Sequence, residues 1–330
     1  MTTSRLLIDV PLEPAIGSRF QPTGFPDIGA ADFDRPVVNA DGSRGWTKSL
    51  LVESAQSMAN HLEGTAWDAS SNQPVAIFGG LPYIRVIAES DERFLTSSRV
   101  EAHRLASAFV KDSKLDGVPM IDVIRTKLGL RDDTPIPHTQ VAAAIFELDP
   151  FCLVHGIFFA DAKWPGQPKI ARALTSFVEA SGVQRADSGG VKRDHVRHKM
   201  NDVDGGTAEG YGSVPFHRTE WTAEAIVASF SLDRRQLRSY GLGKAAEQLL
   251  EGIALWEIRS LLDDGLRLRT ACDLVPVDDS IVARDGSVLP ELDEIEQRIH
   301  AALGECGDQL GAKRAVDVRW SDGGKKGKAG

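Results

Sequence analysis

Two histidines, His195 and His198, lie three residues apart beside a run of cations that begins with Lys192 and Arg193. A metal ion would need further Cys, His or carboxylate ligands, but no cysteine pair lies nearby and the flanking cations would repel it. A histidine could instead act as the general base of an RNA-cleaving site, with Lys192 or Arg193 stabilising negative charge. The same residues could also bind a polyanion without cleaving it.

The charge pattern around these residues is compatible with binding of a polyanion. Between Arg185 and Lys199 there are five Lys or Arg residues and two Asp residues, whereas the whole chain has a net charge of -9. A cationic island in an acidic chain is typical of a surface that holds a polyanion in one place. Gly189 and Gly190 lack a Cβ atom, so the backbone here can approach a ligand closely. A solvated loop whose cations only aid solubility is the alternative.

Two other patterns exclude common nucleotide and metal sites. The run Gly241-Leu242-Gly243-Lys244 resembles part of a phosphate-binding loop, but Arg238 and Ala245 stand where a Walker motif needs Gly and Ser or Thr. The acidic pairs at 132–133, 263–264 and 278–279 are typical of turns and caps. We therefore expect no metal and no cofactor.

A polar stripe on an expected helix at 47–63 adds hydrogen-bonding groups to the cations. An apolar and a polar stripe share the spacing of 4, 3 and 4 residues, formed by Leu51, Ala55, Met58 and Leu62 and by Ser49, Glu53, Gln56 and Asn60. A solvated helix face usually carries Lys and Glu, so an almost uncharged stripe indicates hydrogen bonds to a ligand. An ordinary surface stripe remains the alternative.

Many cations of the chain stand beside Gly, Ser, Thr or Gln. They are Arg19, Lys48, Arg99, Arg104, Arg172, Lys192, Arg193, Arg218, Arg267 and Arg269. This mixture suits a phosphate-sugar backbone, because cations neutralise phosphates while hydroxyls, amides and backbone N–H groups fix the register. Intramolecular ion pairs with some of the 47 acidic residues are the alternative.

The composition predicts a soluble globular protein. Of the 330 residues 42% are apolar and 26% charged, and no segment is long and apolar enough to cross a membrane. The N-terminus lacks the apolar region of a signal peptide, and the three cysteines are far apart. We therefore expect a reducing, cytoplasmic location.

The expected elements form an α+β fold. Strands at 5–10, 151–159, 225–232 and 266–275 and helices at 47–63 and 233–262 give the order βαββαβ of a modified ferredoxin-like or RRM core. Further elements are expected as a strand at 81–87, helices at 97–108, 141–146, 170–180 and 291–303, and exposed loops at 17–26 and 184–213. The core with its insertions at about 64–150 and 160–220 would span 1–275, followed by an acidic helical extension at 276–320 and a disordered basic tail at 321–330.

Six motifs resemble, in order, those of the RAMP-superfamily backbone subunit of type I-G (formerly I-U) CRISPR effectors, the Cas-seven-type protein of a Cascade-like complex. They are RFQPTGFPDIG at 19–29, LVESAQSMAN at 51–60, EAHRLAS at 101–107, SGGVK at 188–192, YGLG at 240–243 and LRLRTACDL at 266–274. The resemblance covers roughly residues 5–275.

The resemblance implies a non-enzymatic subunit of a CRISPR surveillance complex for antiviral defence. Copies of the chain would polymerise along the guide crRNA in a helical filament, and a protruding hairpin would kink the strand while the remaining bases pair with target DNA. Further partners would be the large subunit and the guide-end-capping subunit. The resemblance implies no membrane.

Contacts with the guide RNA are expected in the 19–23 loop, at Gln56 and Asn60 of the polar stripe, and in a loop at 188–192. The predicted RNA-binding residues are Arg19, Gln21, Thr23, Lys48, Gln56, Asn60, Arg99, His103, Arg104, Ser188, Gly189, Gly190, Lys192, Arg193, Arg267 and Arg269. Two alternatives remain open at this point. One is a RAMP-fold RNA endonuclease, and the other is a protein-only scaffold whose acidic segment at 273–310 docks a basic partner.

Overall fold

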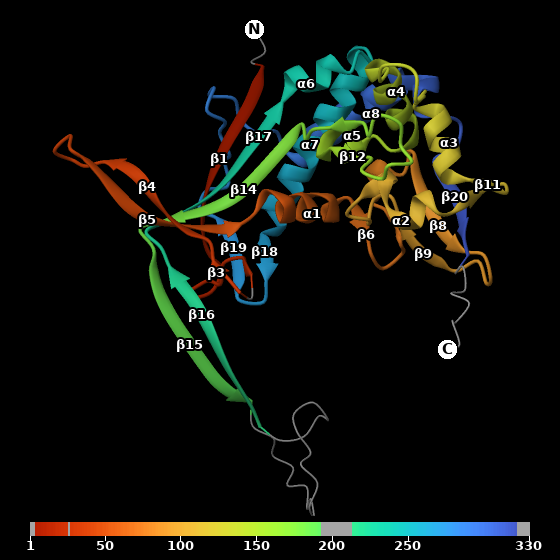
Figure 1. The fold of residues 1–330 in the computed structure, drawn as a ribbon. Coiled ribbons are helices and arrows are strands. Elements are labelled where there is room, and N and C mark those ends of the chain that lie inside the picture. Colours follow the sequence, from red (N-terminus) through yellow and green to blue (C-terminus); the bar gives the residue numbers. More distant parts are fainter. Residues whose placement is uncertain (1–3, 26, 193–212, 322–330) are drawn as a thin grey trace, which may run out of the picture.

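The computed structural model describes residues 4–25, 27–192 and 213–321 and has a mixed α+β fold (Figure 1). Its main sheet has seven strands, and every neighbouring pair in it is antiparallel. In spatial order the strands are β18 (Leu266–Arg269), β19 (Cys272–Pro276), β1 (Arg5–Pro14), β17 (Ala225–Asp233), β14 (Leu174–Ser181), β5 (Arg44–Glu53) and β4 (Asp32–Val38).

The central strands form because every second side chain is buried. On β1 the buried face carries Leu6, Ile8, Val10 and Leu12, and on β17 it carries Ile226, Ala228, Phe230 and Leu232. Ile8 lies opposite Phe230, which in turn lies opposite Ser176 on β14. A period of two with one apolar face is what a sheet covered on that side requires.

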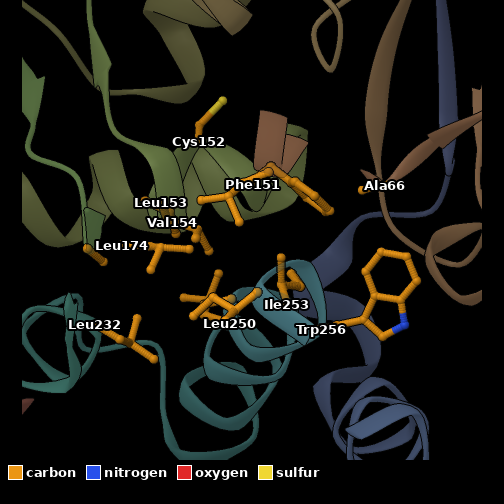
Figure 2. Close-up of a cluster of buried hydrophobic side chains, with 14 of the residues drawn as sticks. Ala66, Phe151, Cys152, Leu153, Val154, Leu174, Leu232, Leu250, Ile253 and Trp256 are labelled. Atoms are coloured by element: carbon orange, nitrogen blue, oxygen red, sulfur yellow. The ribbon is translucent and has the colours of Figure 1, made fainter. Parts of the chain in front are cut away.

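Helices cover this apolar face. The long helix α7 (Lys244–Asp264) packs against α1 (Ala55–Thr65), α5 (Phe151–His155) and α8 (Leu292–Cys306), and α1 and α5 both contact β14. Figure 2 shows Leu153 of α5 and Leu174 of β14 directed toward Leu250 and Ile253 of α7. Burying this many large apolar groups makes the sheet and α7 one core. Two further helices are α4 (His138–Leu148) and α6 (Arg234–Ser239).

A second sheet of five strands lies beside the helices (Figure 1). Its order is β11 (Val118–Pro119), β10 (Lys114–Leu115), β20 (Ala315–Trp320), β8 (Tyr83–Ala88) and β9 (Phe94–Ser97). The C-terminal strand β20 runs parallel to β8, so residues near the end of the chain complete a sheet that began at residue 83. Short helices accompany it, namely α2 (Ala108–Lys111), α3 (Met120–Lys127) and the 3-10 helices η1 (Ala76–Phe78), η2 (Arg104–Ala106) and η4 (Gly307–Leu310).

Two antiparallel ribbons leave the body of the molecule (Figure 1). The longer one pairs β15 (Gln184–Lys192) with β16 (Val214–Thr222), and the other is the outer part of β4 and β5. The β15–β16 pair forms a two-stranded sheet of its own. Other short pairs are β2 (Gly24–Phe25) with β3 (Gly29–Ala30), β6 (Trp67–Asp68) with β7 (Gln73–Pro74), and β12 (Ile157–Phe158) with β13 (Lys169–Ile170).

Several expected elements are confirmed. The strands at 5–10, 81–87 and 225–232 correspond to β1, β8 and β17, and the helices at 141–146 and 291–303 to α4 and α8. The helix expected at 233–262 is two helices, α6 and α7, separated at residues 240–243. Asp233 caps α6, because its carboxylate accepts the backbone N–H of Gln236 at 3.0 Å. None of the helices in the described ranges is both long and apolar enough to span a bilayer.

Other predicted elements are wrong. The helix expected from residue 47 begins only at Ala55, because residues up to Glu53 belong to β5 and the hydroxyl of Ser54 caps the helix. The strand expected at 151–159 is the buried helix α5, followed by two residues of β12. The helix expected at 170–180 is the central strand β14.

Three further predictions are corrected. The segment 97–108 is a strand end, a turn and the 3-10 helix η2 rather than a helix. The expected loop at 188–192 is the end of strand β15. The single strand expected at 266–274 is the hairpin β18–β19. The expected extension at 276–320 contains α8 and β20, and most of the expected tail lies outside the described residues.

Candidate nucleic-acid interface

An open hollow of about 650 Å³ lies beside α1, and we refer to it as the α1 hollow. Four segments line it: one face of α1, the turn before η2, the hairpin β12–β13 and the residues that follow that hairpin. The lining residues are Gln56, Asn60, Ala102, His103, Arg104, His155, Gly156, Ile157, Phe158, Ala160, Lys169, Ile170, Ala171 and Arg172. The structure thus places four predicted contact residues, Gln56, Asn60, His103 and Arg104, around one hollow.

The α1 hollow is cationic. None of its lining residues is an Asp or a Glu, and within the described ranges neither Lys169 nor Arg172 forms an ion pair. Burial lowers the pKa of the Arg172 guanidinium, and the nearby charge of Arg104 lowers it further while Glu63 opposes the change. The positive charge of Arg172 is therefore disfavoured in the free protein, and an anion bound in the hollow would stabilise it.

Arg104 lines the α1 hollow, but its charge is neutralised by an ion pair with Glu63. Its guanidinium donates to both carboxylate oxygens of Glu63 at 2.6 Å and to the carbonyl oxygen of Gly156 at 3.0 Å. Such a two-bond pair occupies most of the donors of an arginine. The prediction that Arg104 contacts RNA is therefore corrected to a structural role.

Arg99 lies in the interior. Only 4% of its side chain is exposed, its Nε atom lies 2.7 Å from the Asp149 carboxylate, and its guanidinium lies 3.5 Å from the centre of the Phe151 ring. The prediction of an RNA contact at Arg99 is wrong, because its charge is compensated by a carboxylate that is itself buried.

A second hollow of about 820 Å³ lies at the base of the β15–β16 ribbon, and we refer to it as the ribbon-base hollow. It is formed by the loop before β2, by β3 and by the ribbon. Its lining residues are Gln21, Pro22, Thr23, Gly24, Ile28, Gly29, Ala30, Asp32, Arg185, His217, Arg218, Thr219, Trp221 and Arg269. Gln21 and Thr23 were predicted from sequence, whereas Arg185 and His217 were not among the predicted contact residues.

Backbone hydrogen bonds fix the loop of the ribbon-base hollow. Phe20 and Trp221 exchange two of them, at 2.9 and 2.8 Å, and the N–H of Thr23 donates to the Val52 carbonyl at 2.8 Å. Arg269 donates to the Gln21 carbonyl at 2.8 Å and pairs with the buried Glu53. Arg269 therefore holds the loop against β5 and also lines the ribbon-base hollow, and its predicted RNA contact stays a prediction.

The other predicted cations lie on the surface. Lys48 and Arg19 are exposed and pair with Asp34 at 3.2 Å and Glu220 at 3.5 Å. The Lys48–Asp34 pair is exposed on both sides and therefore weak, so a phosphate can replace that carboxylate, whereas Glu220 is buried. Arg267 is exposed on β18 and lines neither hollow.

The predicted residues Ser188, Gly189, Gly190 and Lys192 lie on β15 of the ribbon. Gly190 lies opposite Phe216, whose ring covers it, since a Cβ atom at position 190 would lie 3.0 Å from the Phe216 Cζ atom. The Arg218 guanidinium lies 5.2 Å from the centre of the same ring. Arg193, His195 and His198 fall outside the described residues.

The two hollows flank the start of α1. Thr23 of the ribbon-base hollow is bonded to Val52, Glu53 and Ser54 follow in the chain, and Gln56 of the α1 hollow lies on the first turn of the helix. The structure thus places one polar, cation-containing hollow on each side of the β5–α1 junction. A surface of this kind is suited to the backbone of a single-stranded nucleic acid.

A family model described as CRISPR-associated protein GSU0053 matches residues 6–185, more than half of the chain. The chain belongs to this CRISPR-associated family. The matched range includes α1, all the residues that line the α1 hollow, and the first residues of β15. No curated protein matches the chain.

Among solved structures, a chain of a "CRISPR RNA-guided surveillance complex, pre-nicking" has a similar fold at 11% sequence identity. The alignment covers 96% of this chain and 95% of that chain, with a TM-score of 0.37.

Sequence reasoning did not name Phe158 or Lys169 and gave Arg172 only a general place among the cations. The segment 151–159 was interpreted as one buried strand, which hid Phe158. Arg172 lies in the segment 170–180, which was interpreted as a helix, and Lys169 directly precedes that segment. The signal available in the sequence was the change from the apolar run that holds Phe158 and Phe159 to a segment that carries Lys169 and Arg172.

Proposed function

We propose that this chain is a structural, RNA-binding backbone subunit of a CRISPR surveillance complex. One observation carries the proposal. Among the residues that the structure describes, Lys169 and Arg172 of the α1 hollow form no ion pair and lie beside the amides of Gln56 and Asn60, and no carboxylate lines the hollow. Cations for phosphates and amides for register are the groups that bind a nucleic-acid backbone of any sequence.

The arrangement of the main sheet supports the proposal. In chain order β1, α1, β14, β17, α7 and β19 alternate as βαββαβ, and the four strands lie side by side as β19-β1-β17-β14 with antiparallel neighbours. We infer that this is the RRM-like core expected from the sequence, with β14 in place of the segment 151–159. The hairpins β4–β5 and β15–β16 are then extensions of that core.

The β15–β16 ribbon has the form that a strand-kinking element requires. It protrudes from the body beside the ribbon-base hollow, and it carries Arg185, His217 and Arg218 at its base (Figure 1). We infer that copies of the chain assemble along the guide crRNA, that the ribbon interrupts the strand between copies, and that the exposed bases pair with target DNA. The large subunit and a guide-end-capping subunit would complete the complex, in the cytoplasm.

The subunit would hold RNA without cleaving it. Its task would be to keep the guide intact through repeated pairing with targets, so sequence specificity would lie in base pairing while the protein contacts backbone and shape. Guide RNA recovered from the complex should therefore have uniform length after incubation with the purified protein, with or without added magnesium.

The test is purification of the full chain from cells that express a matching CRISPR array. Size-exclusion chromatography with ultraviolet absorbance should give a large species that contains RNA and becomes smaller at high salt, because phosphate contacts weaken with ionic strength. Sequencing should identify the RNA as the guide. A particle of constant size without RNA, both alone and with the partner subunits co-expressed, would overturn the proposal. Loss of the RNA through cleavage would favour the endonuclease.

A further inference from the structure

Phe158 is an exposed aromatic residue inside a cationic hollow. It lies on β12, 47% of its surface is accessible, and it lines the α1 hollow together with Lys169 and Arg172. Its neighbour Phe159 points the other way and is buried at 1% exposure. Contact between an apolar phenyl ring and water is unfavourable. Its place among charged and amide groups therefore indicates a ligand that has both an aromatic and an anionic part.

The β12–β13 hairpin holds Phe158 in place. Phe158 lies opposite Lys169, and Ile157 lies opposite Ile170, in an antiparallel pair. The N–H of Phe159 donates to the Pro168 carbonyl at 3.1 Å, and its ring packs edge-on against Trp164 at 5.0 Å between centroids. The backbone that carries Phe158 is therefore positioned before any ligand binds, which lowers the entropic cost of binding.

Charged and amide groups surround this ring. The Lys169 Nζ atom lies 5.7 Å from the centre of the Phe158 ring. The half-buried Arg172 lines the same hollow from the residues that follow β13, and Gln56 and Asn60 line it from α1. A ring to stack on, two cations and two amides correspond in kind to the base, phosphate and sugar of one nucleotide.

We infer that the α1 hollow seats one nucleotide of the bound strand, with its base stacked on Phe158 and its phosphate held by Arg172 and Lys169. The inference rests on the proposed function and adds the residue that contacts a base. The hollow of about 650 Å³ accommodates one nucleotide. Because every base has a π face, the seat tolerates any guide sequence.

The test uses the full chain and synthetic RNA that carries one 2-aminopurine, placed at each position in turn. One position per bound copy should show quenched fluorescence, and Phe158→Ala should remove the quenching and weaken RNA binding roughly tenfold. Phe158→Tyr should keep both. Removing the base at the quenched position should weaken binding to the wild type but not to Phe158→Ala. The control is Phe109→Ala, which removes an exposed phenyl ring outside both hollows.

The outcomes separate this inference from the proposed function. If the wild type and Phe158→Ala bind RNA equally and quench at the same positions, the nucleotide seat is wrong and the RNA-binding proposal stands. If the folded wild type binds no RNA, the proposed function fails. Tighter binding of free AMP or UMP than of the oligonucleotide, lost in Phe158→Ala, would assign the hollow to a free nucleotide and overturn the inference.

Discussion

Arg104 and Glu63 form a two-bond ion pair at the back of the α1 hollow. Both N–O distances are 2.6 Å, and the two side chains are 9% and 10% exposed. Arg104 also has a left-handed backbone conformation, with φ 51°, and it donates to the carbonyl of Gly156, the residue before β12. This pair therefore links α1, η2 and the β12–β13 hairpin, the three elements that shape the hollow.

We predict that Arg104→Ala destabilises the protein strongly. The change leaves the Glu63 carboxylate buried without a partner, which costs about 3–5 kcal/mol of the free energy of unfolding. Urea unfolding at neutral pH measures this loss. The double variant Glu63→Leu/Arg104→Met should recover most of it, because no charge remains buried. A loss below about 1 kcal/mol in Arg104→Ala would show that the pair is not structural.

The buried arginines illustrate what sequence could not predict. Arg99 and Arg104 stand beside small and polar residues, as RNA-binding cations often do, and sequence reasoning placed both on the surface. Their partners Asp149 and Glu63 are far away in the chain and become neighbours only in the folded protein. Residue type near an arginine therefore does not reveal whether its charge is free. Gln56 and Asn60 line the α1 hollow and Gln21 lines the ribbon-base hollow, so their predicted RNA contacts stay predictions.

The errors in secondary structure have a related cause. The run at 151–159 is apolar except for His155 and Gly156, and such an apolar run does not distinguish a buried helix from a buried strand. In β14 the buried face includes Ser176 while the half-buried Phe177 lies on the other side, which hides the period of two. Only pairing with β17 and β5 decides that this segment is a strand. The mixed α+β class was nevertheless predictable, because β1, β17 and α7 have clear patterns.

We predict that Lys169→Ala and Arg172→Ala weaken RNA binding most at low salt. Each change removes one phosphate contact, so the slope of log affinity against log salt should decrease by about 0.7 per residue for single-stranded RNA. Fluorescence anisotropy over a salt series measures the slope. Because burial and Arg104 already disfavour the charge of Arg172, its removal should not lower the free energy of unfolding.

A matched control for these variants is Arg298→Ala. Arg298 is an exposed cation on α8 that pairs with Glu294, and it lines neither hollow. Its removal should leave both the affinity and the slope unchanged. An equal loss in Arg298→Ala would mean that RNA responds to total charge rather than to the α1 hollow.

We predict a loss of stability at alkaline pH that depends on Tyr240. Burial raises the pKa of this phenol from 10.0 to about 12, and its hydroxyl donates to the Leu153 carbonyl at 2.8 Å. The unfolded chain releases this proton near its ordinary pKa while the folded chain retains it. The contribution is therefore present below pH 10.0 and is lost as pH rises to about 12.

Urea unfolding at several alkaline pH values tests this prediction. Tyr240→Phe should cost about 1 kcal/mol at neutral pH, from the lost hydrogen bond. Its free energy of unfolding should also decrease less between pH 10.0 and about 12 than that of the wild type. Some dependence should remain, because burial also raises the pKa of Tyr83. Identical pH dependence in the two proteins would contradict the assignment to Tyr240.

We predict that Gly190→Ala reduces RNA affinity without lowering global stability. The new Cβ atom would lie 3.0 Å from the Phe216 Cζ atom, so the ring must move, and with it the Arg218 guanidinium that lies 5.2 Å from its centre. Arg218 lines the ribbon-base hollow, so RNA should bind severalfold more weakly. The ribbon strands pair with each other in a separate sheet, so the free energy of unfolding should change by less than about 0.5 kcal/mol.

The matched control is Gly304→Ala on α8, where a Cβ atom would have no neighbour within 4 Å. That variant should bind RNA like the wild type and gain up to about 1 kcal/mol from better helix propensity. Anisotropy titrations and urea unfolding of both glycine variants give the comparison. Equal RNA affinity in the two would show that the position of Arg218 does not matter for binding. A large loss of stability in Gly190→Ala would show instead that the ribbon folds together with the core.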